Sequence, residues 1–288
     1  TAERFMVAAA HPEASRVGHA VLQAGGNAVD AMVAVQLMLN LVEPQSSGIG
    51  GGSFLLYWDA TERRLYAVDG REKAPAAAGP DLFIDPATGE PLGFWDAVIG
   101  GRSVGVPGTL KLLEEVHTRF GSQPWAALVE PTIALAGSGF AVSPRLAGAI
   151  AGAAEQGLDR FADTRSYFFD DAGAPLAENA ALANADLAQT LRSIADEGSA
   201  PFYSGAIGEA IVAAVTGAES NPGGMTMADL GAYEVIFREP VCAAYRALEV
   251  CGMGPPSSGG LTVGQILGLL DHVDMAGYGP TPTGAHLF

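Results

Sequence analysis

Arg71 is a cation placed where a protein could hold an anion. It follows Gly70 in the segment DGREKAP (residues 69–75), just past an apolar run. Glycine permits unusual backbone angles, and a guanidinium can hold a carboxylate through two parallel hydrogen bonds. Arg71 therefore predicts an anion clamp. The alternative is an exposed ion pair with Glu72 or Asp69, which would contribute at most about 1 kcal/mol to stability.

The overall charge makes this arginine more informative. The chain has 15 Lys and Arg residues against 32 Asp and Glu residues, a net charge of −17, and its only lysines are Lys73 and Lys111. An anionic small molecule would need a local cation to offset the general repulsion. Nucleic acid and anionic membranes are poor partners, because the chain lacks the basic stripe that phosphate neutralisation requires.

Two glycine-rich loops could bring backbone amides close to the same ligand. They are GIGGGS (residues 48–53) and PPSSGG (residues 255–260). The first loop contains the GxGxxG spacing of a dinucleotide site, but it follows an expected helix and precedes an expected strand. That fingerprint must instead follow a strand and open a helix. A tight helix-to-strand connection also needs glycines, and local sequence favours this structural interpretation.

The candidate nucleophiles are weak. Ser257 and Ser258 lack a G-x-S-x-G elbow and a histidine placed to act as base, so helix capping or substrate contact is the better interpretation. Thr1 could act as an N-terminal nucleophile with its own amine as base, but residues 2–5 lack the strand pattern that would hold it in a core. Without a CxxC or HExxH motif, we expect no metal and no cofactor.

Cys242 and Cys251 lie in two short expected strands around a turn at residues 246–247. A two-residue turn there pairs residue 242 with residue 251 across the hairpin. A cross-strand disulfide and two reduced core thiols are both compatible with this register.

The elements expected around these residues form one domain, residues 1–288. A strand at 6–10 leads into a helix at 13–24, and residues 28–42 are apolar nearly all round, which indicates a buried helix. Strands at 54–58 and 64–69 form a hairpin, and residues 76–102 form a loop. Helical periodicity covers 108–120, 125–137, 143–155, 184–197, 203–216, a short capped helix at 226–233 and an apolar helix at 261–270. Further strands are expected at 167–173, with an Asp/Gly turn, and at 234–238.

No apolar run reaches the 18 residues that a membrane-spanning helix needs. The first residues do not form a basic, apolar signal region, so the chain is expected to be cytoplasmic or already processed.

Six motifs in register resemble the gamma-glutamyltranspeptidase family. They are MVAAAHP (6–12), GGNAVDA (25–31), GIGGGSF (48–54), REKAP (71–75), PGT (107–109) and PPSSGG (255–260). The resemblance extends from about residue 6 to the C-terminus, and the chain is similar to the large subunit of that family.

The resemblance implies an α+β fold of the N-terminal nucleophile hydrolase type, a four-layer αββα sandwich completed by a second subunit. That small subunit would come from the same self-cleaving precursor and would supply the threonine nucleophile. The implied reaction transfers the gamma-glutamyl group of glutathione or a similar amide to water or an amino acid. The resemblance also implies a periplasmic or secreted protein whose signal peptide has been removed, with a cytoplasmic location left open.

For single residues, the resemblance implies that Arg71 holds the alpha-carboxylate of the donor and that no catalytic residue lies in this chain. The family's large subunit continues past the helix expected near residues 282–286, so a tail beyond Phe288 is expected to be missing. Structural roles near the site centre are implied for Gly50, Gly51, Gly52, Ser257, Ser258, Gly259 and Gly260.

Two alternatives remain. A cephalosporin acylase of the same family would use Arg71 for the distal carboxylate of a glutaryl side chain. A non-catalytic binding or scaffold protein is the alternative from another class.

Overall fold

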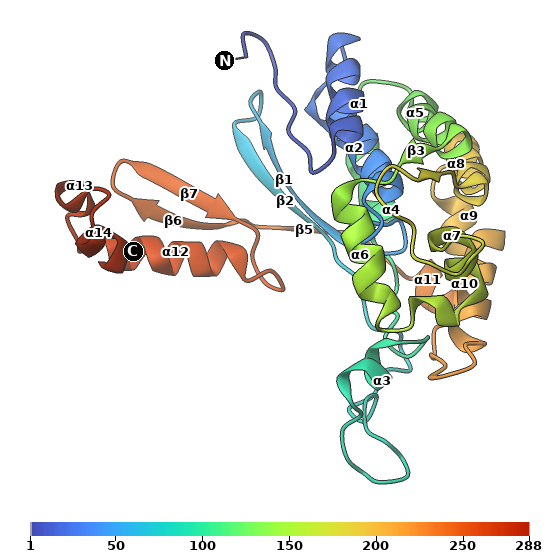
Figure 1. Ribbon diagram of the computed structural model, residues 1–288. Helices are drawn as coiled ribbons and strands as arrows, with labels where there is room; N and C mark the ends of the chain where they lie inside the picture. The colour runs from blue at the N-terminus through green and yellow to red at the C-terminus, as the bar shows by residue number, and fades with distance from the viewer. Residues whose placement is uncertain (1, 288) are drawn as a thin grey trace. The chain divides into compact units, whose positions relative to one another are not determined.

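The computed structural model describes residues 2–287, and the chain forms two compact units. The first unit runs to Gly52 and resumes over Arg71–Glu234, and the second contains Ser53–Gly70 and the residues from Val235 onward. Figure 1 labels the elements of both units. The single domain expected over residues 1–288 stays a prediction.

Two helices open the first unit. Helix α1 spans Pro12–Gln23, and α2 spans Ala28–Val42. Most of α2 is buried, which confirms the helix predicted from its apolar surface. The strand expected at residues 6–10 is wrong: these residues pair with no described strand, and Met6 is 78% exposed. An apolar run forms a strand only where a neighbour supplies the other half of the hydrogen-bond ladder.

Helix α2 begins with a capping box. The side chain of Asn27 accepts hydrogen bonds from the amides of Val29 and Asp30, and Asp30 Oδ2 accepts one from the Asn27 amide. The Asp30 carboxylate also accepts hydrogen bonds from the amides of Ser122 and Gln123. The start of α2 is therefore tied to a turn about 90 residues further along the chain.

The remaining elements of the first unit are mostly helical. The helices predicted near 108–120, 125–137, 143–155 and 184–197 are confirmed as α4, α5, α6 and α8. The strands β3 and β4 pair with each other. The bounds are α3 Phe94–Val98, α4 Thr109–Phe120, α5 Trp125–Ser138, β3 Phe140–Ala141, α6 Pro144–Ala154, η1 Leu158–Arg160 (a 3-10 helix), α7 Ala162–Phe168, β4 Ala181–Leu182, α8 Ala185–Glu197, α9 Ala200–Ser204, α10 Ala206–Thr216 and α11 Met227–Gly231.

Three predictions in this unit need correction. The expected helix at 203–216 is divided between α9 and α10 by Gly205, whose backbone is extended with φ −125° and ψ −161°. Glycine is a poor helix former, so a break there is physically reasonable. The aromatic strand expected at 167–173 begins inside α7. Beyond the helix, Phe169 forms an isolated antiparallel bridge with Pro175 around the predicted Asp/Gly turn, in which Gly173 N donates to Asp170 O. The expected loop at 76–102 contains α3.

The second unit contains the predicted hairpin. Strands β1 (Ser53–Asp59) and β2 (Arg64–Gly70) pair antiparallel, and β5 (Ile236–Arg238) joins the other edge of β2. The Nε of Arg238 donates to Asp69 Oδ2 at 2.7 Å, which links β5 to the end of β2.

A second hairpin in this unit confirms the register predicted from the cysteines. Strand β6 (Val241–Tyr245) pairs with β7 (Leu248–Gly252), and Cys242 lies opposite Cys251. The two sulfur atoms are bonded in a disulfide. The chain ends with α12 (Gly259–Leu270), α13 (Met275–Tyr278) and α14 (Pro282–Leu287). Among the described residues, no helix combines the length and apolarity needed to cross a bilayer.

Candidate functional site

The backbone around Arg71 is held by partners from two distant parts of the first unit. The Tyr233 hydroxyl donates a hydrogen bond to the Arg71 carbonyl at 2.7 Å. Two residues later, the Lys73 amide donates to the Val106 carbonyl at 3.2 Å, and the Val106 amide donates back to Lys73 at 2.7 Å. Three hydrogen bonds to backbone groups of residues 71–73 therefore hold the segment that carries the arginine.

The Lys73 ammonium contacts Glu234 and Tyr233 of the same unit. It donates to the Glu234 carbonyl at 2.8 Å and lies 4.8 Å from the ring centroid of Tyr233, a cation–π distance. The same tyrosine therefore binds the segment twice, through its hydroxyl and through its ring. The charge of Lys73 stabilises the site instead of facing a ligand.

The guanidinium of Arg71 faces solvent. Its side chain is 61% exposed, and its Nε lies 3.1 Å from Glu72 Oε2. An ion pair at such an exposed position adds little stability, because water and salt screen it. The guanidinium carries five N–H donors in a planar fork, a geometry that matches a carboxylate.

The position of Glu72 explains why residue 52 in the GIGGGS loop is a glycine. A Cβ atom added to Gly52 would lie 2.4 Å from Glu72 Oε2 and 2.7 Å from its backbone nitrogen. A Cβ added to Gly105 would lie 2.9 Å from Glu72 Cβ. Glu72 is therefore held between two glycines that allow the backbones to approach. Gly50 differs, because a Cβ there would meet no atom within 4 Å.

The glycine loop also caps helix α4. The Gly51 carbonyl accepts hydrogen bonds from the amides of Gly108 and Thr109, at 2.9 and 3.0 Å. Helix amides near an N-terminus need such acceptors, and the N-cap residue Gly108 has no side chain to supply one. These contacts support the structural interpretation of the loop, since its backbone serves α4.

Tyr203 completes this cap from a distant helix, α9. Its hydroxyl donates to the Pro107 carbonyl at 3.0 Å and accepts from the Lys111 amide at 3.2 Å. Burial raises the pKa of Tyr203, so the hydroxyl keeps the proton that it donates. The start of α4 is thus fixed by groups on both sides.

The PPSSGG loop lies in the second unit. Ser257 Oγ accepts from the Gly259 amide at 3.3 Å, whereas Ser258, the N-cap residue of α12, makes no side-chain cap bond. A Cβ on Gly260 would lie 2.6 Å from the Met253 carbonyl oxygen. Close backbone packing therefore requires this glycine, which supports a structural role. Arg71 and Gly50–Gly52 belong to the first unit, and a place for Ser257–Gly260 near the site stays a prediction.

Sequence reasoning missed two residues that build the site. Tyr233 lies 162 positions from Arg71, and Tyr203 lies 96 positions from Pro107, so no local pattern marks either contact. The sequence marks Glu72 only as an ion-pair partner, although glycines such as Gly52 and Gly105 indicate places where backbones can approach closely. Thr1 and Phe288 lie outside the described residues.

Three side chains in the second unit are of types that bind metals, but two of them are bonded to each other. Ligand atoms of Cys242, Glu249 and Cys251 lie within 4.8 Å of one another. The two sulfurs are joined in a disulfide, whereas cysteine binds a metal as a free thiolate. We therefore assign no metal to this group.

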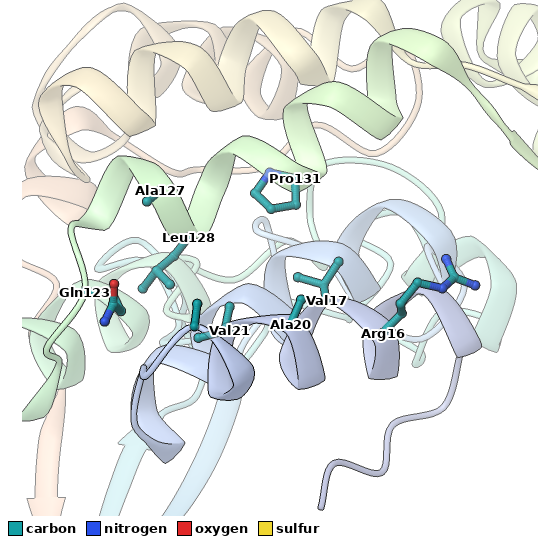
Figure 2. A pocket seen from close by; sticks show the side chains of 9 residues that line it. Arg16, Val17, Ala20, Val21, Gln123, Ala127, Leu128 and Pro131 are labelled. Atoms are coloured by element: carbon teal, nitrogen blue, oxygen red, sulfur yellow. The ribbon is translucent and has the colours of Figure 1, made fainter.

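An apolar cavity of about 360 Å³ lies between α1 and α5 (Figure 2). Arg16 is at one end, paired with Glu13, and Gln123 is at the other. The lining contains no nucleophile and no acid–base pair, so it is not a candidate for chemistry. The lining residues are Arg16, Val17, Ala20, Val21, Ala24, Gln123, Ala127, Leu128 and Pro131.

Comparison with known proteins identifies relatives along most of the chain. The family model described as Gamma-glutamyltranspeptidase matches residues 14–288. The chain is 41% identical over 273 residues to a glutathione hydrolase proenzyme of Bacillus subtilis, covering 95% of this chain and 45% of the relative. It is 36% identical over 287 residues to an acylase ACY 1 proenzyme of a Pseudomonas species, covering 98% of this chain and 50% of that relative.

Solved structures agree with the sequence relatives. The structure of Helicobacter pylori gamma-glutamyltranspeptidase matches with a TM-score of 0.92 and 33% identity, over 100% of this chain and 80% of that chain. The mixed helix and strand content of the chain is therefore that of a known fold. The chain spans about half the length of the curated relatives that it matches.

Proposed function

Because the chain belongs to the gamma-glutamyltranspeptidase family, we propose that it forms the large-subunit portion of a gamma-glutamyltranspeptidase or glutathione hydrolase. The donor would be glutathione or a similar gamma-glutamyl amide, and the acceptor would be water or an amino acid. The name of the Bacillus subtilis relative supports this substrate class.

The observation that carries the proposal is the setting of Arg71. Tyr233 and Val106 hold the backbone that carries this exposed guanidinium, so that backbone needs no further ordering when a carboxylate binds. In a chain of net charge −17, an anionic donor requires such a local cation. We assign Arg71 to the alpha-carboxylate of the gamma-glutamyl donor, where two parallel hydrogen bonds would fix its orientation.

The bond-breaking step would use a partner chain. A threonine hydroxyl on the small subunit attacks the gamma-carbonyl carbon, the C–N bond breaks, and the amine leaves with a proton. The resulting ester is then attacked by water or by the amino group of an acceptor, which releases the threonine. In this scheme, the chain described above binds and orients the donor and supplies no catalytic residue.

The complete protein would be a four-layer αββα sandwich formed by two subunits of one precursor. The word proenzyme in the names of the relatives supports cleavage of a precursor, and their greater length leaves room for a second subunit. We further propose a periplasmic or secreted location. The Cys242–Cys251 disulfide supports it, because disulfides persist mainly in oxidising compartments.

A cephalosporin acylase is the second candidate. The acylase relative from Pseudomonas favours it, although that relative is 36% identical whereas the glutathione hydrolase is 41% identical. Arg71 would then bind the distal carboxylate of a glutaryl group. The two substrates differ in the amino group that only the gamma-glutamyl donor carries.

Rates of nitroaniline release distinguish a gamma-glutamyltranspeptidase from a cephalosporin acylase. The assembled two-subunit enzyme is assayed with gamma-glutamyl-p-nitroanilide and with glutaryl-p-nitroanilide, and kcat/KM is compared. We expect the gamma-glutamyl substrate to be preferred by about tenfold or more, since buried groups that bind the amino group would be left unpaired by the glutaryl substrate. A strong preference for the glutaryl anilide would overturn the proposal in favour of the acylase.

A further inference from the structure

A cavity of about 360 Å³ in the first unit is lined by charges of both signs and by an indole ring. Arg102 and Arg160 provide the positive charges, and Asp85 and Asp96 provide the negative ones. Trp95, 49% exposed, supplies the ring. None of these residues takes part in the Arg71 site.

The four charges do not neutralise one another directly. Over residues 2–287, neither Arg102 nor Arg160 forms an ion pair with a carboxylate. Both arginines still line the same cavity as the two aspartates. Opposite charges kept apart around a single cavity suit a dipolar ligand, because its two poles can each meet the opposite sign.

The guanidinium of Arg102 is held in place by a hydrogen bond. It donates from a terminal nitrogen to the Leu82 carbonyl at 3.1 Å, and the Arg102 amide donates to the Asn221 carbonyl at 2.9 Å. A side chain held in this way loses little further freedom when a ligand binds. The Arg160 side chain lies close to Gly157, where a Cβ atom would overlap with Arg160 Nε.

The wall that carries Trp95 and Asp96 is also formed in advance. The Asn221 side-chain amide donates to the carbonyls of Asp96, Ala97 and Ile99, at 3.0, 3.1 and 3.2 Å. These contacts satisfy carbonyls at the end of α3, which would otherwise lack partners. The short helix is therefore attached firmly to the segment around Asn221.

A second cavity adjoins the first at the indole ring. It measures about 260 Å³ and shares Trp95 and Ile99 with the charged cavity. Its other lining residues include Leu158 and Phe161, and no charged residue lines it. The pair of cavities thus has a charged part and an apolar part that meet at Trp95.

We propose that the paired cavities bind a free α-amino acid with a large apolar side chain. The α-carboxylate would lie by Arg102 and Arg160, and the α-ammonium would lie by Asp85 and Asp96. The side chain would pack on Trp95 and enter the apolar cavity. Small-molecule sites combine these features: a mainly apolar pocket of a few hundred Å³ and a few convergent polar groups.

Isothermal titration calorimetry of the full chain with L-phenylalanine tests this binding without any assay of gamma-glutamyl transfer. We expect saturable binding at one site per chain. L-Phenylalaninamide lacks the carboxylate and N-acetyl-L-phenylalanine lacks the charged amine, so each should bind about tenfold or more weakly than L-phenylalanine. No binding of L-phenylalanine, or equal binding of either analogue, would overturn the proposal.

The substitution Arg160→Gln provides the residue-level test, with Arg192→Gln as its control. Arg192 is exposed on α8 and lines neither cavity, so both variants lose one positive charge from the surface. Circular dichroism establishes that each variant is folded. We expect the affinity for L-phenylalanine to fall about tenfold or more in Arg160→Gln and to stay unchanged in Arg192→Gln. Equal affinities in the two variants would contradict the proposed site.

Discussion

At the scale of single residues, Arg71 and Glu72 are neighbours with different surroundings. Arg71 extends into solvent, while Glu72 lies between Gly52 and Gly105, with its Oε2 atom buried. This difference decides which of the two can meet a ligand. The guanidinium can meet a substrate carboxylate, and the glutamate is committed to packing between backbones.

The close approach of Glu72 predicts an asymmetric response to alanine in the glycine loop. Gly52→Ala should lower the free energy of unfolding by about 1–3 kcal/mol, because the added methyl group overlaps with Glu72. Gly50→Ala is the matched control and should change it by less than about 0.5 kcal/mol, since no atom lies near its Cβ position. Urea unfolding of both variants measures the difference, and equal stabilities would disprove the packing role of Gly52.

The residues of the site were predictable only where the signal was local. Arg71 follows Gly70 in an acidic chain, so composition and position both mark it. Tyr233 carries no such mark, because its hydroxyl partner is 162 positions away and tyrosines are common in ordinary cores. Contacts of this length depend on the fold and cannot be read from neighbouring residues.

At the scale of elements, α2 depends on the carboxylate of Asp30 at its start. Burial alone would raise the pKa of Asp30, but hydrogen bonds from Ser122, Asn27 and Gln123 together hold that pKa below its ordinary value. A carboxylate with a lowered pKa in the folded state stabilises the fold above its unfolded pKa. That contribution disappears as the pH falls through the folded pKa.

This linkage predicts a pH-dependent effect for Asp30→Asn. At pH 7 the variant should be less stable than the wild type by about 1.5–3 kcal/mol, because charge-assisted hydrogen bonds are lost. The difference should shrink as the pH falls below about 4, where the wild-type carboxylate also becomes protonated. Urea unfolding at pH values from 7 to 3 measures it. A difference that stays constant over this range would show that the charge of Asp30 contributes nothing.

Helices with a clear apolar pattern were predicted well. Strands outside the two hairpins were predicted less well, because a strand also needs a neighbouring strand to pair with. The period of 3.6 gave α4, α5, α6 and α8, and an apolar surface nearly all round gave α2. The strand at 6–10 was wrong because its short apolar run has no described strand to pair with. The strand at 167–173 was wrong for Tyr167 and Phe168, which lie in α7, because aromatic side chains also occur in helices; Phe169 still forms an isolated bridge.

At the scale of the whole molecule, the chain spans about half the length of its curated relatives. Six short motifs in register predicted the family, which the matching family model then confirmed over residues 14–288. The division into two compact units was not predicted. It reflects the pairing of β2 with β5, two strands far apart in sequence, and no local period records that pairing.

The proposed precursor predicts the composition of the purified protein. When a gene that encodes the proposed precursor is expressed, mass spectrometry should find two polypeptides, one containing this chain and a second that begins with threonine. Self-cleavage next to that residue would free its amine to act as base. A single uncleaved or lone polypeptide that still binds the donor would favour the non-catalytic binding protein instead.

The kinetic effect of Arg71→Ala in the assembled enzyme tests the central claim most directly. With gamma-glutamyl-p-nitroanilide as donor, KM should rise about a hundredfold or more, because the substrate carboxylate would lose its charge-assisted hydrogen bonds. Arg192→Ala removes the same charge at an exposed position of α8 and should leave KM unchanged. A KM for Arg71→Ala equal to that of the wild type would contradict the assignment of Arg71 to the donor carboxylate.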